Sequence, residues 1–426
     1  MVIRYSTLVR VAFVLAFCAG LIVADARAES PILTGPIEVF GNDKIRDSVI
    51  LREIPLQTGQ PFSYSLLEAG RRNLWRVPGI DYAEITVAYQ TADSSLGLRV
   101  FVTEQSTLSG NVWLERGYED DLSLGLRATD VSFRGTGQKV DASAVVINNA
   151  LFRLGWENPW VRGPHVGVGA RVSYRSYRYV YDDFGSALAG ARIRRSSVGF
   201  SVFRNLGARS RLSAQAEYEW AEGGVEGITI DPSGDRYPLF ELGIDWDRRD
   251  NVPYPHKGTY VRLRGRSIGP FDDLYSIGEG VADVRAFVPM FGRAVVAAHA
   301  VLVMRDGHNI PVYRRQHIGG GNTLRGWDYG SFHGRNSLVG GMEYRVPLNF
   351  TRSEPLGDVL LGIEVHAFAD FGGAWERPGD LDDNTFHGSA GVGVGLLNRQ
   401  IEGLRFDYGW RRGAKGRFHF EIGMKF

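Results

Sequence analysis

Residues 107–426 alternate between apolar and polar side chains in one segment after another, and no other feature of the chain restricts its fold as strongly. The last segment is the clearest, because one parity is apolar throughout: Phe418, Phe420, Ile422, Met424 and Phe426. Successive side chains of a β-strand point to opposite faces, so this alternation predicts strands with one apolar and one polar face. We count sixteen such segments, separated by turn residues.

The polar faces of these predicted strands carry charges that the core of a soluble fold would not tolerate. In one segment Val261 and Leu263 alternate with Arg262, Arg264 and Arg266. Arginines on the inner face of a soluble β-sandwich would be desolvated at high cost. In a β-barrel whose apolar face contacts lipid, the same arginines line a water-filled lumen. The sequence therefore predicts a mainly β fold, with a 16-stranded antiparallel transmembrane β-barrel over residues 107–426.

The connections between the predicted strands are alternately short and longer. Short turns of such barrels lie in the periplasm and longer loops lie outside. The longest connection, residues 307–335, is then external and joins strands eleven and twelve. To close the barrel, strand one (108–115) must meet strand sixteen (418–426). Strand one contains Ser109-Gly110-Asn111, residues with low β-propensity, so we expect a weak seam there.

The N-terminus has the pattern of an export signal. Basic residues precede the apolar run Val11–Ala24, and Ala26-Arg27-Ala28 follows it. This arrangement predicts a secretory signal peptide over residues 1–28. Its removal would take away Cys18, the only cysteine, and would exclude disulfides and thiol chemistry from the exported chain.

Residues 29–106 predict a small α+β domain that precedes the barrel. The expected order is strand, helix, helix, strand, strand. Helical spacing of apolar residues places the helices at 43–54 and 61–75, with Ser63 or Ser65 as cap candidates. Alternation places the strands at 32–40, 82–89 and 96–102.

The connection 307–335 contains a glycine-rich stretch that ends in a charged and aromatic tip. Gly319 and Gly320 allow tight backbone turns, and the tip reads Leu324-Arg325-Gly326-Trp327. Loops of this length within a compact fold are uncommon and usually functional.

Several motifs together resemble the BamA/TamA-type outer-membrane protein assembly factor superfamily, also called bacterial surface antigens. The tip resembles the Val-Arg-Gly-Phe signature of that family's sixth external loop, with Trp327 in place of phenylalanine. Residues 72–82 resemble the helix-to-strand passage of the family's POTRA domain. Other matching stretches lie at 247–251, 255–258, 368–373 and 404–408. The last strand, with its apolar parity from Phe418 to Phe426, resembles the C-terminal signal of most outer-membrane barrels. One POTRA copy fits before residue 107, and this departure favours a specialised or auxiliary member.

The resemblance implies a role in inserting barrel proteins or passing polypeptides across the bacterial outer membrane, with the N-terminal domain in the periplasm. It also implies that the loop folds into the lumen, where Arg325 pairs with an acidic residue. Strand parity supplies the partners independently: Asp370 is the first choice, followed by Glu343 and Asp407. A forked arginine–carboxylate bond is the strongest side-chain pairing for fixing a loop.

Enzymatic functions find little support in the sequence. The nine histidines show no metal-ligand spacing, and we find no nucleophile and base in a recognisable pattern. We therefore expect no enzyme activity, no cofactor and no metal. Removal of the predicted signal peptide would change the formal net charge from +1 to about −1, which gives no general attraction for nucleic acid. The expected partners are the lipid bilayer, unfolded outer-membrane or secreted polypeptides, and periplasmic chaperones or accessory lipoproteins. A passive outer-membrane channel and a two-partner-type secretion transporter are the alternative functions.

Overall fold

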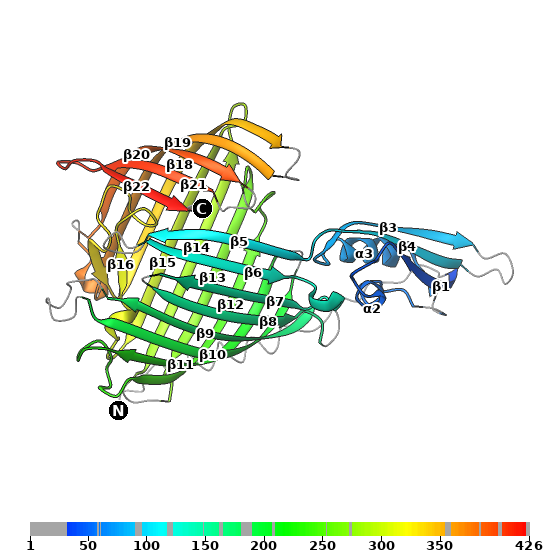
Figure 1. Cartoon of the computed structure of the whole chain (residues 1–426), viewed down its shortest axis with the longest axis horizontal. Coiled ribbons are helices and arrows are strands. Elements are labelled where there is room, and N and C mark those ends of the chain that lie inside the picture. Colours follow the sequence, from blue (N-terminus) through cyan, green and yellow to red (C-terminus); the bar gives the residue numbers. More distant parts are fainter. Residues whose placement is uncertain are drawn as a thin grey trace.

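The computed structural model describes residues 32–422 except 58, 60, 90–95, 117–121, 148, 162–164, 180–189, 207–208, 253, 272–274, 354–358, 383–384 and 399–402. The predicted signal peptide lies outside the described residues. A small α+β domain is followed by one large sheet that curves into a barrel wall (Figure 1).

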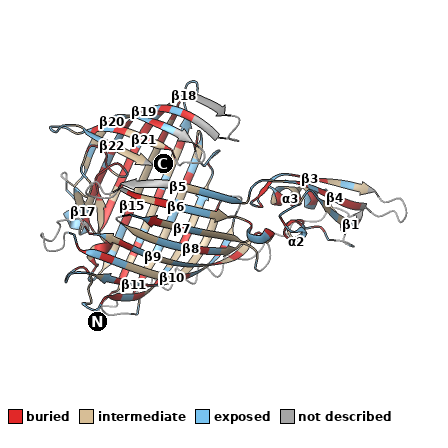
Figure 2. Ribbon diagram, viewed as in Figure 1, coloured by how far each residue is buried: buried red, intermediate tan, exposed pale blue. Residues whose placement is uncertain are grey.

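The small domain packs two helices on a four-stranded sheet. Its elements are β1 (Ile32–Phe40), α2 (Asp47–Leu51), β2 (Pro61–Phe62), α3 (Tyr64–Leu74), β3 (Ile80–Tyr89) and β4 (Leu96–Glu104). The strand order is β2-β1-β4-β3, and only β1 and β4 are parallel. Apolar residues from the helices and the sheet form its core, among them Ile50, Leu74 and Val100 (Figure 2).

Both predicted helices are shorter in the structure than the sequence pattern indicates. The first begins at Asp47 instead of Asp43. The cause is Glu104, whose carboxylate accepts the backbone N–H groups of Lys44 at 2.9 Å and Ile45 at 2.6 Å. These donors are satisfied without a helix. The second helix begins at Tyr64, since residues 61–62 pair with β1 as a short strand.

Glu53, which lies just after α2, makes the stability of this domain dependent on pH. Burial raises the pKa of Glu53 to about 7, although the charges of Arg52 and Arg76 lower it. Its reference pKa is 4.5, so ionisation opposes folding, and the domain loses stability as the pH rises from about 4.5 to about 7. We expect Glu53→Gln to stabilise a 29–106 fragment by up to about 3 kcal/mol at pH 8 and to have no effect at pH 4. Urea unfolding followed by circular dichroism measures this. Glu84→Gln, on the exposed face of β3, is the control, and an equal gain at both pH values would contradict the prediction.

The large sheet has sixteen strands, each antiparallel to its neighbours, which confirms the predicted fold class. The strands are β5 (Leu108–Arg116), β6 (Leu122–Asp130), β7 (Lys139–Val146), β8 (Ala150–Asn158), β9 (Val166–Arg178), β10 (Arg192–Asn205), β11 (Arg211–Gly223), β12 (Asp235–Asp247), β13 (Gly258–Ile268), β14 (Ile277–Pro289), β15 (Val295–Gly307), β18 (Asn336–Ser353), β19 (Val359–Trp375), β20 (His387–Asn398), β21 (Leu404–Trp410) and β22 (Arg417–Ile422). Neither α-helix of the described residues is long and apolar enough to cross a bilayer.

Strand parity divides the wall into an apolar outer face and a charged inner face. On β13, Leu263 is exposed outward, while Arg264 forms ion pairs on the inner side with Glu241 and Asp245 of β12. On β19, Ile363 and Val365 are exposed outward, while Glu364 and His366 are buried inside. These charged residues of the predicted strands therefore face the lumen.

The two edge strands of the wall, β5 and β22, come close without forming a paired ladder among the described residues. The expected closed seam is thus absent from this part of the chain. β22 ends at Ile422, earlier than expected, and residues 423–426 lie outside the described residues. On the other edge, Ser109-Gly110-Asn111 offer few side-chain atoms for cross-strand packing.

The small domain contacts the turns at one end of the barrel. The backbone N–H of Arg46 donates to the carbonyl of Gly135 at 3.0 Å, and the guanidinium of Arg52 lies 5.3 Å from the ring centre of Trp160. A Cβ atom on Gly135 would meet the carbonyl of Lys44 at 2.0 Å, so only glycine allows this close approach.

Candidate functional site

The connection between β15 and β18 enters the barrel and packs against its inner wall. It contains η3 (Val312–Arg314) and a small hairpin of β16 (Gln316–Ile318) and β17 (Phe332–Gly334). At its tip, the side chains of Leu324 and Arg325 are 0% exposed. We call residues 308–335 the lumen loop.

Arg325 binds all three of the carboxylates that strand parity identified. Its Nε and one terminal nitrogen fork onto Asp370 at 2.7 and 2.8 Å. The other terminal nitrogen donates to Glu343 at 2.7 Å and to Asp407 at 2.9 Å. The sequence predicted a single partner with two fallbacks. In the structure, one guanidinium joins three strands, β18, β19 and β21.

The carboxylates around Arg325 are shared with a larger buried ionic cluster. Glu343 also accepts from Arg345 at 2.8 Å and from Arg405 at 2.6 Å. His366 lies 2.7 Å from Asp407 and 3.4 Å from Glu364. All these side chains are at least 95% buried, so bulk water has little access to the cluster. Because water cannot replace a lost partner there, each group depends on the others.

Glycines let the tip of the lumen loop approach the wall closely. Gly326 has φ +84°, and its backbone packs on Gly409 of β21. A Cβ atom on Gly409 would lie 2.7 Å from the nitrogen of Gly326. Gly319 has φ +123°, and a Cβ atom there would meet the carbonyl of Asp328 at 2.0 Å. Gly320 also adopts a positive φ, of +86°. A side chain at Gly326 or Gly409 would therefore push the tip, and Arg325 with it, away from the wall.

Trp327 sits in an aromatic setting at the outer side of the tip. Its ring lies 4.7 Å from that of Phe332 and 5.0 Å from that of His387, between ring centres. The guanidinium of Arg411 lies 3.8 Å from the ring centre of Trp327. A cation–π contact of this kind is stronger with tryptophan than with phenylalanine.

The tip also contacts β22, the edge strand. The backbone N–H of Gly326 donates to Nε2 of His419 at 2.9 Å, and the hydroxyl of Tyr329 donates to Glu421 at 2.6 Å. Asp328 forms an ion pair with Arg417. The lumen loop therefore holds β22 from the inside.

A second anchor, which the sequence analysis did not identify, holds the beginning of the lumen loop. Arg314 donates to the Tyr237 hydroxyl at 2.8 Å and to Glu219 at 2.9 Å. The Tyr313 hydroxyl donates to Asp235 at 2.7 Å. These partners lie on β11 and β12, whereas Arg325 binds the wall from β18 onward. The inward parity of Glu219 was the only signal in the sequence.

The predicted C-terminal signal residues lie on the outer face of β22 as far as the structure describes them. Phe418 is exposed, and Phe420 packs on Phe406 with ring centres 5.1 Å apart. Ile422 is the last residue of the strand, and Met424 and Phe426 lie outside the described residues.

Two family matches cover most of the chain. Residues 132–426 match the Omp85 superfamily domain, and residues 33–105 match a POTRA domain described as a surface antigen variable number repeat. The chain is 24% identical over 421 residues to the outer membrane protein assembly factor BamA of Nitratidesulfovibrio vulgaris. The match covers 94% of this chain and 52% of that protein, so the chain spans about half the length of this curated relative.

Solved structures share the fold. BamA from Haemophilus ducreyi lacking POTRA domains 1–3 superposes with a TM-score of 0.68 and 17% identity, covering 93% of this chain and 84% of that one. CdiB from Acinetobacter baumannii gives a TM-score of 0.65 and 14% identity, covering 92% and 74%. At these identities the likeness establishes the fold alone.

Proposed function

The chain belongs to the Omp85 superfamily, and from this premise we propose that it is an insertase or translocase for polypeptides. It is an outer-membrane protein whose POTRA domain lies in the periplasm. The proposed clients are unfolded outer-membrane or secreted polypeptides. Insertion and translocation require strand pairing and a path through the wall, so the proposed activity needs no covalent chemistry.

The observation that carries this proposal is the open edge between β5 and β22. Unpaired strand edges present backbone N–H and C=O groups that another strand can bind. A client strand pairing with such an edge would satisfy its own backbone groups before it meets lipid, where unsatisfied groups are costly. In this mechanism the lumen loop regulates access, since its tip holds β22 through Gly326, Asp328 and Tyr329.

The POTRA domain offers a second edge for the same kind of binding. Within the described residues, β3 pairs only with β4, so its other side is available to an extended peptide. Tyr82 and Val87 on this strand are exposed. We propose that β3 receives client segments by strand addition and that residues 29–106 form the folding unit.

Locking the seam with a disulfide is expected to abolish client assembly while the barrel stays folded. Cysteines at Leu108, Gly110 and Val112 on β5 are paired one at a time with a cysteine at Phe420 on β22. The variants replace the native protein in cells, and the outer-membrane proteome is compared under oxidising and reducing conditions. Locked variants should lose client proteins, and reduction should restore them.

Tyr408→Cys with Phe418→Cys provides the matched control, because these residues are already cross-strand partners on β21 and β22. That lock should leave activity unchanged. Full activity in a locked β5–β22 variant would argue against opening of the edge and favour a passive channel.

A further inference from the structure

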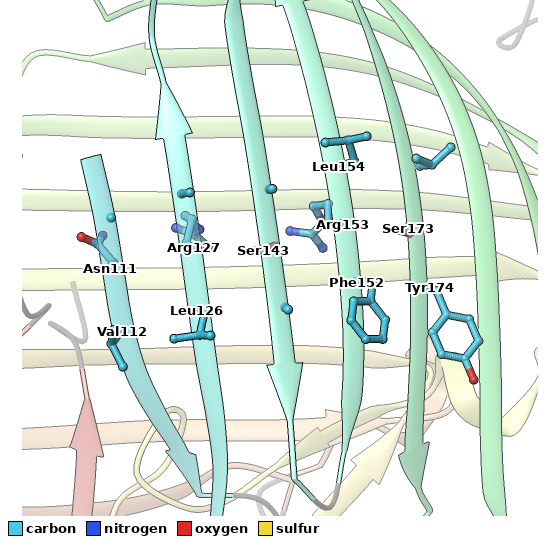
Figure 3. Close-up of a pocket in the computed structure, with 15 residues that line it drawn as sticks. Asn111, Val112, Leu126, Arg127, Ser143, Phe152, Arg153, Leu154, Ser173 and Tyr174 are labelled. Atoms are coloured by element: carbon cyan, nitrogen blue, oxygen red, sulfur yellow. The ribbon is translucent and has the colours of Figure 1, made fainter. Parts of the chain in front are cut away.

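The apolar outer face of the wall is hollowed near its β5 edge. The hollow has a volume of about 850 Å³ and extends over β5 to β9 (Figure 3). Strand register arranges the outward residues of these strands in rows that cross the sheet. Figure 3 shows one such row, with Val112, Leu126, Phe152 and Tyr174, and Leu154 in the next row. Most of the residues that line the hollow are apolar.

The row that contains Leu154 has no large side chain on its first three strands. Gly110, Ala128 and Ala142 are successive register partners on β5, β6 and β7, and all three are exposed. Leu154 follows them on β8 and closes this end of the row. The other end, at Gly110, lies on the edge strand of the wall. We call the channel over Gly110, Ala128 and Ala142 the outer groove.

Larger side chains stand along both sides of the outer groove. On the side toward the centre of the membrane, the neighbouring row contains Val112 and Leu126, which are both exposed outward. On the periplasmic side, the neighbouring row contains Leu108 on β5, Val140 on β7 and Trp156 on β8. The groove therefore has a floor, two sides and one closed end, and it opens outward and at the β5 edge.

The row on the periplasmic side marks the membrane interface. The ring N–H of Trp156 donates to Gln138 at 2.9 Å, and Asp130, in the same row, accepts the backbone N–H of Ser132 at 3.0 Å. Tryptophan rings of this kind lie at the level of the lipid headgroups. The outer groove lies one row, roughly 7 Å, further into the bilayer. It is therefore in the hydrocarbon of the periplasmic leaflet.

We propose that the outer groove binds one acyl chain of a phospholipid from the periplasmic leaflet. Three strand spacings from β5 to β8 give the groove a length of roughly 14 Å. An acyl chain spans about half of a hydrocarbon core that is roughly 30 Å thick, so the two lengths match. A chain in the groove contacts protein on three sides, whereas a chain on a flat part of the wall contacts it on one. The additional dispersion contacts favour the groove.

A polypeptide does not suit the outer groove, because the groove crosses the strands. A strand that pairs with β5 must run alongside it, parallel or antiparallel. A segment that crossed the strands could not pair its backbone groups with the wall, and unpaired groups are costly in lipid. An acyl chain has no such groups. The proposal goes beyond client assembly and does not depend on it.

The test measures where a photoreactive lipid labels the full-length protein. The protein is placed in nanodiscs of phosphatidylethanolamine and phosphatidylglycerol, with a trace of phosphatidylethanolamine that carries a diazirine in the middle of one acyl chain. After irradiation, mass spectrometry compares lipid adducts on β6 to β8 with those on β14 and β15. We expect at least five-fold more label per strand on β6 to β8. Ala128→Leu combined with Ala142→Leu fills the groove and should reduce this excess at least three-fold.

Ala286→Leu combined with Ala298→Leu is the matched control, because these alanines are also cross-strand partners of outward parity, on β14 and β15. Heat-modifiable migration on gels confirms that both double variants are folded. Equal labelling of the two regions, or an excess on β6 to β8 that survives in the filled variant, overturns the proposal. An equal loss of that excess in the control variant also overturns it.

A photoreactive amino acid in place of Leu126 tests the choice of occupant. Adducts of this residue with lipid support an acyl chain, and adducts with a polypeptide in place of lipid overturn it. Both experiments use purified protein without clients, so their result is independent of whether the protein assembles clients in cells.

Discussion

Replacing Arg325 with alanine is expected to release the tip of the lumen loop and abolish client assembly without unfolding the barrel. The change leaves Asp370, Glu343 and Asp407 close together and without the guanidinium that joins them. Removing one partner from a buried ion pair typically costs about 3–5 kcal/mol. The sixteen-stranded ladder does not depend on this contact. The lost free energy should therefore make the loop mobile and release β22 without unfolding the wall.

Conservative variants at this site are expected to fail as well. A lysine ammonium cannot reproduce a planar fork on Asp370 and still reach Glu343 and Asp407, so Arg325→Lys should lose most of the activity. Asp370→Asn keeps the size of the side chain but removes the charge that both ends of the fork bind. The measurements are the outer-membrane proteome, heat-modifiable migration, and protease cleavage within residues 319–330 on intact cells.

Arg262→Ala is the matched control for these variants. Arg262 also lies on the inner wall and binds Asp245 at 2.9 Å, but its side chain is 46% exposed. Exposed ion pairs contribute about 0–1 kcal/mol, so this variant should behave like the original protein. Normal activity and a protected loop in Arg325→Ala, Arg325→Lys and Asp370→Asn together would mean that the cluster has no part in the function.

The regular part of this fold could be predicted from sequence because a transmembrane strand has to alternate. That constraint gave the sixteen strands, the position of the lumen loop between β15 and β18, and the inward parity of Asp370, Glu343 and Asp407. Parity says which way a side chain points, but not how far along the barrel axis it lies. That depth follows from strand tilt and stagger, which alternation does not encode. Convergence of three carboxylates on Arg325 was therefore beyond sequence reasoning.

Irregular segments were harder to predict because their partners are distant in sequence. The backbone of Lys44 is fixed by Glu104, 60 residues further on, and this contact shortened a predicted helix. Arg314 meets Glu219 across 95 residues from within a loop that has no periodic pattern. In both cases a single tertiary contact outweighs the local propensity.

Replacing Arg314 with methionine is expected to free the beginning of the lumen loop while its tip stays fixed. Glu219 keeps its bond to Arg195 at 2.8 Å, so it does not become an isolated charge. The Tyr237 hydroxyl loses one donor but still donates to Glu219 at 2.8 Å. We expect a cost of about 1–3 kcal/mol, smaller than that of Arg325→Ala. External protease should then cut within residues 308–318, and residues 325–330 should remain protected.

Glu219→Gln should be more damaging than Arg314→Met, because it leaves the buried Arg314 and the half-buried Arg195 without a carboxylate. Combining Arg314→Met with Arg325→Ala shows whether the two anchors act through one rigid loop. Arg314 binds β11 and β12, and three strands separate them from β18, so direct coupling between the sites should be small. Additive losses of loop protection, within about 0.5 kcal/mol, would mean that the anchors act independently. A larger departure from additivity would mean that the loop transmits strain between the two walls. Opening at β22 would then change the contacts of the loop with β11.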